Sequence, residues 1–324
     1  MGIYVQRVST MRDTESILST SDGYHSLTYP EVRIKDFTLD VNLPKLQYND
    51  HIPITPNAHR DLGTLNTLPL ELLHEIIHKL DIRTLTDLRH VNRRAMWLVE
   101  SDPQYKTIRK HAFNALRGIL CIETGRWITC EMLYNKLCTA ECEQCGDFGG
   151  YLYILTCERV CFLCLVVEDK RYLPLRYLHA KKKFGINRSI IRTLPTMRSI
   201  PGKYNATDGK ISRGHISLVD FDSARRAGIA LHGSVSAMEQ YVSSMPAPKA
   251  FDGISGNPLR FMAIVRTPWF NKSSQELEWG FHCIACQEEH HSRPLHFRRK
   301  FNVGLFKEHL RECGNIQHGK HHLK

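Results

Sequence analysis

The sequence predicts an α+β protein in which a small helical unit is followed by small domains of short strands and helices. Residues 65–118 place their apolar side chains at helical spacing. By contrast, most of the eleven cysteines fall in two clusters that lie far apart, and the strand-like runs beside these clusters are short. With 324 residues, of which 42% are hydrophobic, the chain is long enough for two or three domains with buried cores.

Composition and residue pattern change several times along the chain, and the changes predict five segments. The first contains four prolines and no sustained period, which is typical of a disordered arm. The segments are residues 1–62, a largely disordered arm; residues 63–118, the helical unit; residues 138–203, a cysteine-rich segment with a basic helical part; residues 204–275, a helical or linker region of unknown fold; and residues 276–324, a C-terminal module with Cys and His.

The cysteines and the hydropathy pattern indicate where the protein works. No stretch is apolar for long enough to span a membrane, and residues 1–20 lack the apolar run of a signal peptide. Clustered cysteines of odd number are more typical of metal binding in a reducing compartment than of disulfides. We therefore expect a soluble protein of the cytoplasm or nucleus, with no membrane partner.

Positive charge is concentrated in one part of the chain. The net charge is +11, and the run from Lys170 to Lys203 contains ten Lys or Arg and no Asp or Glu. A second basic run spans Arg293–Lys300. Such a surface attracts polyanions, including nucleic acid, but the interpretation that we favour is a solvated basic helix and loops.

The helical unit begins at residues 68–80. Pro69 suits the first position of a helix, where its missing N–H group has no cost. We expect a second helix capped by Thr84 and a third that starts at Asp102-Pro103. The apolar residues of the first helix are predicted to share one broad face: Leu72, Leu73, Ile76, Ile77 and Leu80.

The stretch from Leu68 to Arg94 resembles the F-box, particularly its fungal form. The resemblance implies a three-helix unit that docks on a Skp-type adaptor, so that the chain acts as the substrate adaptor of an SCF-type cullin ubiquitin ligase. It also implies a non-catalytic subunit that recruits an unknown protein substrate through its C-terminal region. So short a unit buries too little area to be stable alone, and its leucines must be covered by the rest of the chain or by a partner. The positions that match the adaptor contacts of the family are Leu68, Pro69, Leu72, Ile76, Leu80, Leu85, Leu88 and Val91.

The same helix contains a rival motif. His74-Glu75-Ile76-Ile77-His78 fits the H-E-x-x-H pattern of zinc metallopeptidases, and Glu100 could supply a third ligand. We expect His74 and His78 to lie opposite the Leu/Ile face, towards solvent. The F-box explains many more residues than the peptidase pattern does, and no other catalytic motif is present, so the prediction is that the chain is not an enzyme.

The first cysteine cluster predicts a structural zinc site. Two Cys-x-x-Cys pairs separated by fifteen residues suit four thiolates around one tetrahedral ion. Gly146 follows the first pair, where a knuckle needs a residue free to take positive φ. Cys138 and Cys157 each precede a pair by four residues and remain alternative ligands. The predicted ligands are Cys142, Cys145, Cys161 and Cys164.

The second cluster predicts a second structural zinc site, which would make two ions per chain. A Cys-x-x-Cys pair is followed by a helix that presents a His and a Cys one turn apart. Substitute ligands are His290, His291 and His296, while residues 318–322 are predicted to be a solvated terminus. The predicted ligands are Cys283, Cys286, His309 and Cys313.

Two further functions were weighed against the adaptor. A zinc-dependent nucleic-acid-binding protein would explain the charge and the cysteines, but the segment from Cys138 to Cys164 carries four acidic residues and one arginine. A ring-finger ligase would need eight interleaved ligands in one module, and neither cluster supplies them.

Overall fold

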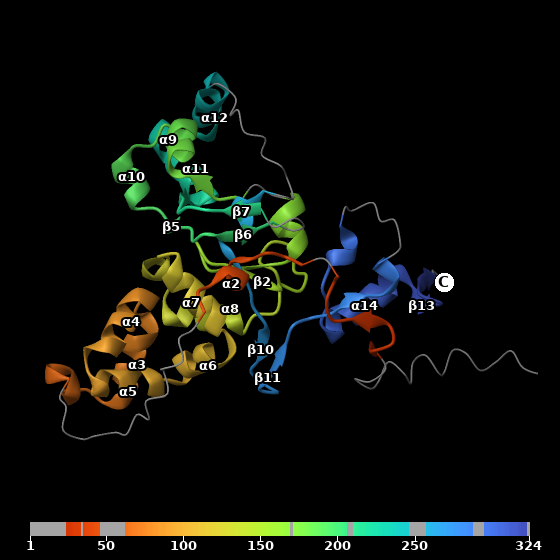
Figure 1. The fold of residues 1–324 in the computed structure, drawn as a ribbon, viewed down its shortest axis with the longest axis horizontal. Coiled ribbons are helices and arrows are strands. Elements are labelled where there is room, and N and C mark those ends of the chain that lie inside the picture. The colour runs from red at the N-terminus through yellow and green to blue at the C-terminus, as the bar shows by residue number, and fades with distance from the viewer. Residues whose placement is uncertain are drawn as a thin grey trace, which may run out of the picture. The chain divides into compact units, whose positions relative to one another are not determined.

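The computed structural model describes residues 24–33, 35–45, 62–168, 171–205, 210–245, 257–287 and 295–322. The fold is α+β, as predicted, with short helices and small antiparallel sheets of two or three strands (Figure 1). The chain forms two compact units instead of five segments. The larger unit is Ile34–Glu278, and the terminal unit combines Met1–Arg33 with Trp279–Lys324. No helix in the described ranges is both long enough and apolar enough to cross a membrane.

The larger unit begins with consecutive short helices (orange to yellow in Figure 1). Helix α3 contacts α5 and α8, and α4 packs on α5 and α7. The helices are α3 (Leu70–Lys79), α4 (Ile82–Val91), α5 (Arg93–Ser101), α6 (Pro103–His111), α7 (Phe113–Cys121) and α8 (Cys130–Leu137).

Polar side chains cap the N-termini of three of these helices. Asp81 caps α4, accepting the Thr84 N–H at 2.9 Å, so the prediction that Thr84 is the cap was wrong by three residues. Asp81 is the favoured cap because its carboxylate also accepts a hydrogen bond from the Thr84 hydroxyl, at 2.7 Å. Asn92 caps α5, and Asp102 caps α6 with Pro103 in the first turn, as predicted.

The apolar residues of α3 are divided between two faces. Leu73 and Ile77 are buried, whereas Leu72 is 50% and Ile76 41% exposed. The predicted broad face is therefore buried only along the stripe of Leu73 and Ile77, which meets the neighbouring helices, while the adjacent stripe of Leu72 and Ile76 is exposed. His74 lies beside that stripe and is half-buried.

A three-stranded sheet forms the centre of the larger unit, in the order β3-β2-β9. Strands β2 (Tyr151–Tyr153) and β3 (Glu158–Val160) form a hairpin, and β9 (Ile264–Arg266) pairs antiparallel with β2. Helix α2 (Leu39–Asn42) packs on β9 and α7. The region 204–275 is thus not a separate linker, since its strand completes a sheet begun more than a hundred residues earlier.

A second sheet, in the order β4-β8-β5, carries four helices. Gly233, at φ +82°, ends the first of the last two helices and separates them. The strands are β4 (Leu175–Arg176), β5 (Thr196–Arg198) and β8 (Ser217–Val219), and the helices are α9 (Tyr177–Phe184), α10 (Arg188–Arg192), α11 (Phe221–His232) and α12 (Val235–Ser244). The remaining elements of this unit are the hairpins β6 (Gly202–Tyr204)–β7 (Lys210–Ser212) and β10 (Trp269–Asn271)–β11 (Glu276–Glu278), with α13 (Pro258–Phe261).

The terminal unit pairs a segment of the N-terminal arm with the C-terminal module. Strand β1 (Thr28–Tyr29) is antiparallel to β12 (His282–Cys283), and Tyr24 is buried against Phe306. The predicted disorder is therefore wrong for residues 24–33 and, because α2 is packed there, for residues 35–45, while residues 1–23, 34 and 46–61 lie outside the described part. The other elements are η5 (Ala285–Gln287), η6 (His296–Arg298), α14 (Val303–Cys313), β13 (Asn315–Gln317) and β14 (Lys320–His322).

Candidate metal centres and the exposed face of helix α3

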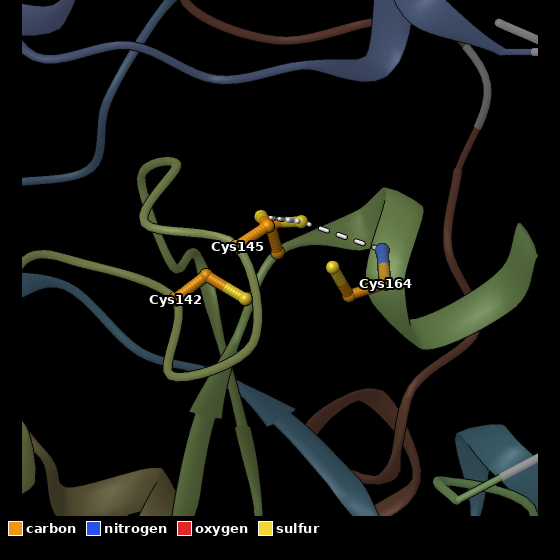
Figure 2. A group of neighbouring side chains, drawn as sticks. Cys142, Cys145 and Cys164 are labelled. Atoms are coloured by element: carbon orange, nitrogen blue, oxygen red, sulfur yellow. Dashed lines mark hydrogen bonds between the residues drawn. The ribbon is translucent and has the colours of Figure 1, made fainter. Parts of the chain in front are cut away.

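Four cysteines of the larger unit converge on one point. The Sγ atoms of the four predicted ligands lie within 4.8 Å of one another, with Cys145 and Cys161 at 3.6 Å. Figure 2 shows Cys142, Cys145 and Cys164 pointing towards the common centre. The group could hold a metal ion, and it consists of the four residues that the double Cys-x-x-Cys pattern predicts: Cys142, Cys145, Cys161 and Cys164.

A tight knuckle and a strand hairpin bring the two pairs together. Gly146 takes φ +81°, and its N–H donates to the Cys142 carbonyl at 2.9 Å, which reverses the chain after the first pair. The second pair follows directly on β3, and Cys161 accepts the backbone N–H of Cys164 at 3.4 Å. These turns are local, and spacing alone was enough to predict them.

Thiol contacts within this group shift the acidity of its members in opposite directions. Hydrogen bonds from Cys145, Cys161 and Cys164 hold the pKa of Cys142 far below its usual value. Contacts with Cys142 and Cys145 raise the pKa of Cys161 and of Cys164. Thiolate is the form of cysteine that binds metal.

The two alternative cysteines stand outside the group. Cys157 occupies the β2–β3 turn at φ +59°, is fully buried, and has its pKa raised to about 12 by burial. Cys138 ends α8, and its carbonyl accepts the indole N–H of Trp269 at 3.2 Å. Both act as packing residues, which resolves the choice that spacing had left open.

A second group of ligands lies in the terminal unit. Cys286 Sγ is 3.4 Å from His309 Nε2 and 3.5 Å from His321 Nε2, and Cys283 Sγ is 3.4 Å from His321 Nε2. The residues come from β12, η5, α14 and β14. This group too could hold a metal ion: Cys283, Cys286, His309 and His321.

His321 replaces Cys313 as the fourth member, which corrects the prediction in two ways. Residues 318–322 are not a solvated terminus, because β13 and β14 form a hairpin whose two turn residues, His318 and Gly319, have φ of +51° and +76°. Two positive φ values match the turn that suits the twist of paired strands. The hairpin returns His321 to the cysteines, and the His-Gly dipeptide between short runs was the signal that could have revealed it.

Cys313 instead contacts the outer nitrogen of a ligand. Its Sγ lies 3.5 Å from His309 Nδ1, while His309 Nε2 faces Cys286. His321 is arranged in the same way, with Nδ1 donating to the Gly314 carbonyl at 3.0 Å. Outer partners of this kind fix the ring orientation and tautomer of metal-binding histidines.

The surroundings of this second group are buried and structured. Hydrogen bonds, above all from Cys286, lower the pKa of Cys283 to about 2. Burial lowers the pKa of the neighbouring His282 to about 3, and its Nδ1 donates to the Arg299 carbonyl at 2.9 Å. Of the substitute ligands, His296 is not in the group, and His290 and His291 lie outside the described residues.

The predicted docking residues differ in their solvent exposure. Pro69, Leu72, Ile76 and Val91 are exposed, the last of them by 68%. Leu68, Leu80 and Leu88 are half-buried. Leu85 is fully buried inside the helical unit. The prediction that Leu85 contacts the partner is therefore wrong, because a buried side chain cannot touch a partner while the unit is folded.

Of the two H-E-x-x-H histidines, His78 is hydrogen-bonded elsewhere, while the buried Nε2 of His74 has no hydrogen-bond partner among the described residues. His78 Nε2 bonds the buried carboxylate of Asp102 at 2.7 Å, and the histidines therefore lie beside the buried stripe of α3, not towards solvent as predicted. Glu100 accepts both Nε and Nη2 of Arg89, at 2.8 and 2.6 Å, and pairs with Arg109. In the described ranges, neither metal-ligand group includes these residues.

No protein-family model, no curated protein and no solved structure matches this chain. Any inference about its activity therefore depends on its own residues and on the F-box resemblance.

Proposed function

We propose that this chain is the substrate adaptor of an SCF-type ubiquitin ligase, docking on a Skp-type adaptor through α3 and the residues around it. One observation carries the proposal: the motif residues Leu72 and Ile76, one turn apart on one face of α3, are both exposed. Two exposed apolar side chains that are adjacent on one helix face form a surface that favours a protein partner.

In this role the chain performs no bond chemistry. Docking would tether it to the cullin scaffold, and its remaining surface would hold the protein substrate. The rate of ubiquitin transfer then rises because the effective concentration of substrate lysines near the charged ubiquitin carrier rises.

We further propose that both metal groups hold structural zinc. A tetrahedral zinc with Zn–S bonds of about 2.3 Å separates its sulfurs by about 3.8 Å, and Cys145 Sγ and Cys161 Sγ are 3.6 Å apart. With Zn–N bonds of about 2.0–2.1 Å, sulfur and nitrogen lie about 3.6 Å apart. The three S···N distances of the second group are 3.4–3.5 Å. Each ion would supply roughly 10–16 kcal/mol of apparent binding free energy to its module.

A pull-down of the full chain with a fungal Skp-type adaptor tests the docking proposal. The double substitution Leu72→Asp/Ile76→Asp should abolish capture, because it places two charges in an apolar interface. The matched control is Leu178→Asp, at a leucine that is 65% exposed on α9, outside the motif. Capture that survives the double substitution, or that Leu178→Asp also abolishes, would contradict docking through α3.

The peptidase alternative has its own test. Glu75 is exposed on α3, so Glu75→Gln should leave the fold and the capture of the adaptor unchanged. If the purified chain cleaved peptides and Glu75→Gln abolished that cleavage, the H-E-x-x-H reading would replace the adaptor proposal.

A further inference from the structure

Four arginines surround one cavity of the larger unit. The cavity has a volume of about 360 Å³ and lies where the helical unit meets the β4-β8-β5 sheet. The backbone joins the two parts there, because the Arg198 N–H donates to the Ile122 carbonyl at 2.9 Å. The lining arginines are Arg83 of α4, Arg126 of η3 (Gly125–Trp127), Arg192 of α10 and Arg198 of β5.

Acidic side chains do not balance this charge. Glu123 is the one carboxylate in the lining, and its Oε1 lies 4.0 Å from Arg198 Nη1, with both side chains more than half exposed. Arg83 pairs with Asp87 at 3.1 Å, again at the exposed surface. Exposed pairs of this kind are weak and yield to a better partner. Within the described part of the chain, Arg126 and Arg192 have no ion pair.

Two polar groups of the cavity are prepared for a ligand: one arginine is held in place, and one hydroxyl lacks a partner. Arg126 donates to the Thr196 hydroxyl at 3.1 Å and stacks over Trp127, 4.7 Å from the ring centroid, so its guanidinium has little freedom to lose on binding. The Tyr177 hydroxyl oxygen is buried and has no hydrogen-bond partner among the described residues. A buried hydroxyl without a partner calls for a ligand or a water.

We propose that this cavity binds the phosphoryl group of a phosphate monoester. A dianionic phosphoryl group accepts hydrogen bonds from several directions at once, which suits a cavity that arginines of four elements line. The volume lies within the range of small-molecule sites, about 300–1,000 Å³, so an esterified organic group also has room. The source is a phosphorylated side chain of a protein or a free phosphate ester. This site does not depend on the docking of α3.

Calorimetric titration of the full chain at constant ionic strength tests the site. The probes are inorganic phosphate, O-phosphoserine and a short phosphoserine peptide, with serine and the unphosphorylated peptide as blanks. Arg192→Gln should weaken binding of the phosphorylated probes by about tenfold, since it removes a charge-assisted hydrogen bond. The matched control is Arg188→Gln, an exposed arginine of the same helix that does not line the cavity.

Tyr177→Phe keeps the packing of the ring and should also weaken binding of the phosphorylated probes while the melting temperature of the free chain is unchanged. Tighter binding of the peptide than of O-phosphoserine would identify a protein as the source, and the reverse order a free ester. The proposal is overturned if no phosphorylated probe binds. Equal binding by Arg192→Gln and Arg188→Gln would overturn it too.

Discussion

Arg159 is a fully buried charge that joins three parts of the larger unit. Its guanidinium donates to the carbonyls of Lys136 at the end of α8 and of Thr267 and Pro268 after β9, at 3.0–3.1 Å. Burial lowers its pKa to about 9, so it remains charged at neutral pH. All three carbonyls lose a charged donor when Arg159 is removed, although that of Lys136 also accepts the Thr139 N–H at 3.4 Å.

Replacing Arg159 with Met should lower the free energy of unfolding by about 3 kcal/mol, because buried carbonyls are left without donors. Urea denaturation followed by circular dichroism measures the change. Arg188→Met, at an exposed arginine, should change the free energy of unfolding by less than about 0.5 kcal/mol. Equal effects of the two substitutions would contradict the role given to Arg159.

The fourth ligand of the second metal group can be decided by substituting single residues. His321→Ala should reduce the zinc content from two ions per chain to about one, because it removes a ligand. Cys313→Ser should keep two ions and weaken the second by about 10–100-fold, since it alters an outer partner of His309. Metal analysis after dialysis against a weak chelator distinguishes the two variants. The opposite pattern would restore Cys313 as the ligand.

At the scale of elements, prediction succeeded where the determining contacts are close in sequence. Asp102-Pro103 correctly predicted the start of α6. The double Cys-x-x-Cys pattern identified all four members of the first metal group, because a knuckle and one hairpin suffice to assemble that group. His321 was missed because it reaches the cysteines only through the β13–β14 hairpin. The sequence did not show which stripe of the apolar face of α3 is buried, because that depends on which helices pack beside it.

The β13–β14 turn offers a test of how that hairpin positions its ligand. Gly319→Ala should weaken binding of the second zinc, because φ +76° strains any residue with a Cβ by about 1 kcal/mol, or roughly fivefold in affinity. Gly304→Ala is the matched control, since Gly304 lies in α14 with ordinary space around it. Competition with a chromophoric chelator measures both affinities. An unchanged zinc affinity in Gly319→Ala would show that the conformation of the turn does not affect metal binding.

At the scale of the whole molecule, the two units differ in how they are assembled. The larger unit is one continuous stretch, whereas the terminal unit needs residues from both parts of the chain. The pairing of Thr28 with Cys283 places the arm beside a candidate metal ligand. Sequence patterns did not predict this pairing, because β1 is only two residues long and its partner is far away in sequence.

Removing residues 1–33 should therefore damage the C-terminal metal group while the larger unit stays folded. The expected zinc content is about one ion per chain, with the helical circular dichroism of the larger unit retained. A chain that lacks only residues 1–23 keeps β1 and should keep two ions. Two ions in the shorter chain would show that β1 does not support the metal group.

The pairing of β1 with β12 also has a consequence for synthesis. Thr28 and Tyr29 leave the ribosome early, but their partners His282 and Cys283 are made only after the whole larger unit. The larger unit can fold as it emerges, whereas the terminal unit must wait for translation to be nearly complete. A ribosome that stalls within the last segment would therefore release a chain with a folded larger unit, an unpaired strand and no second metal group.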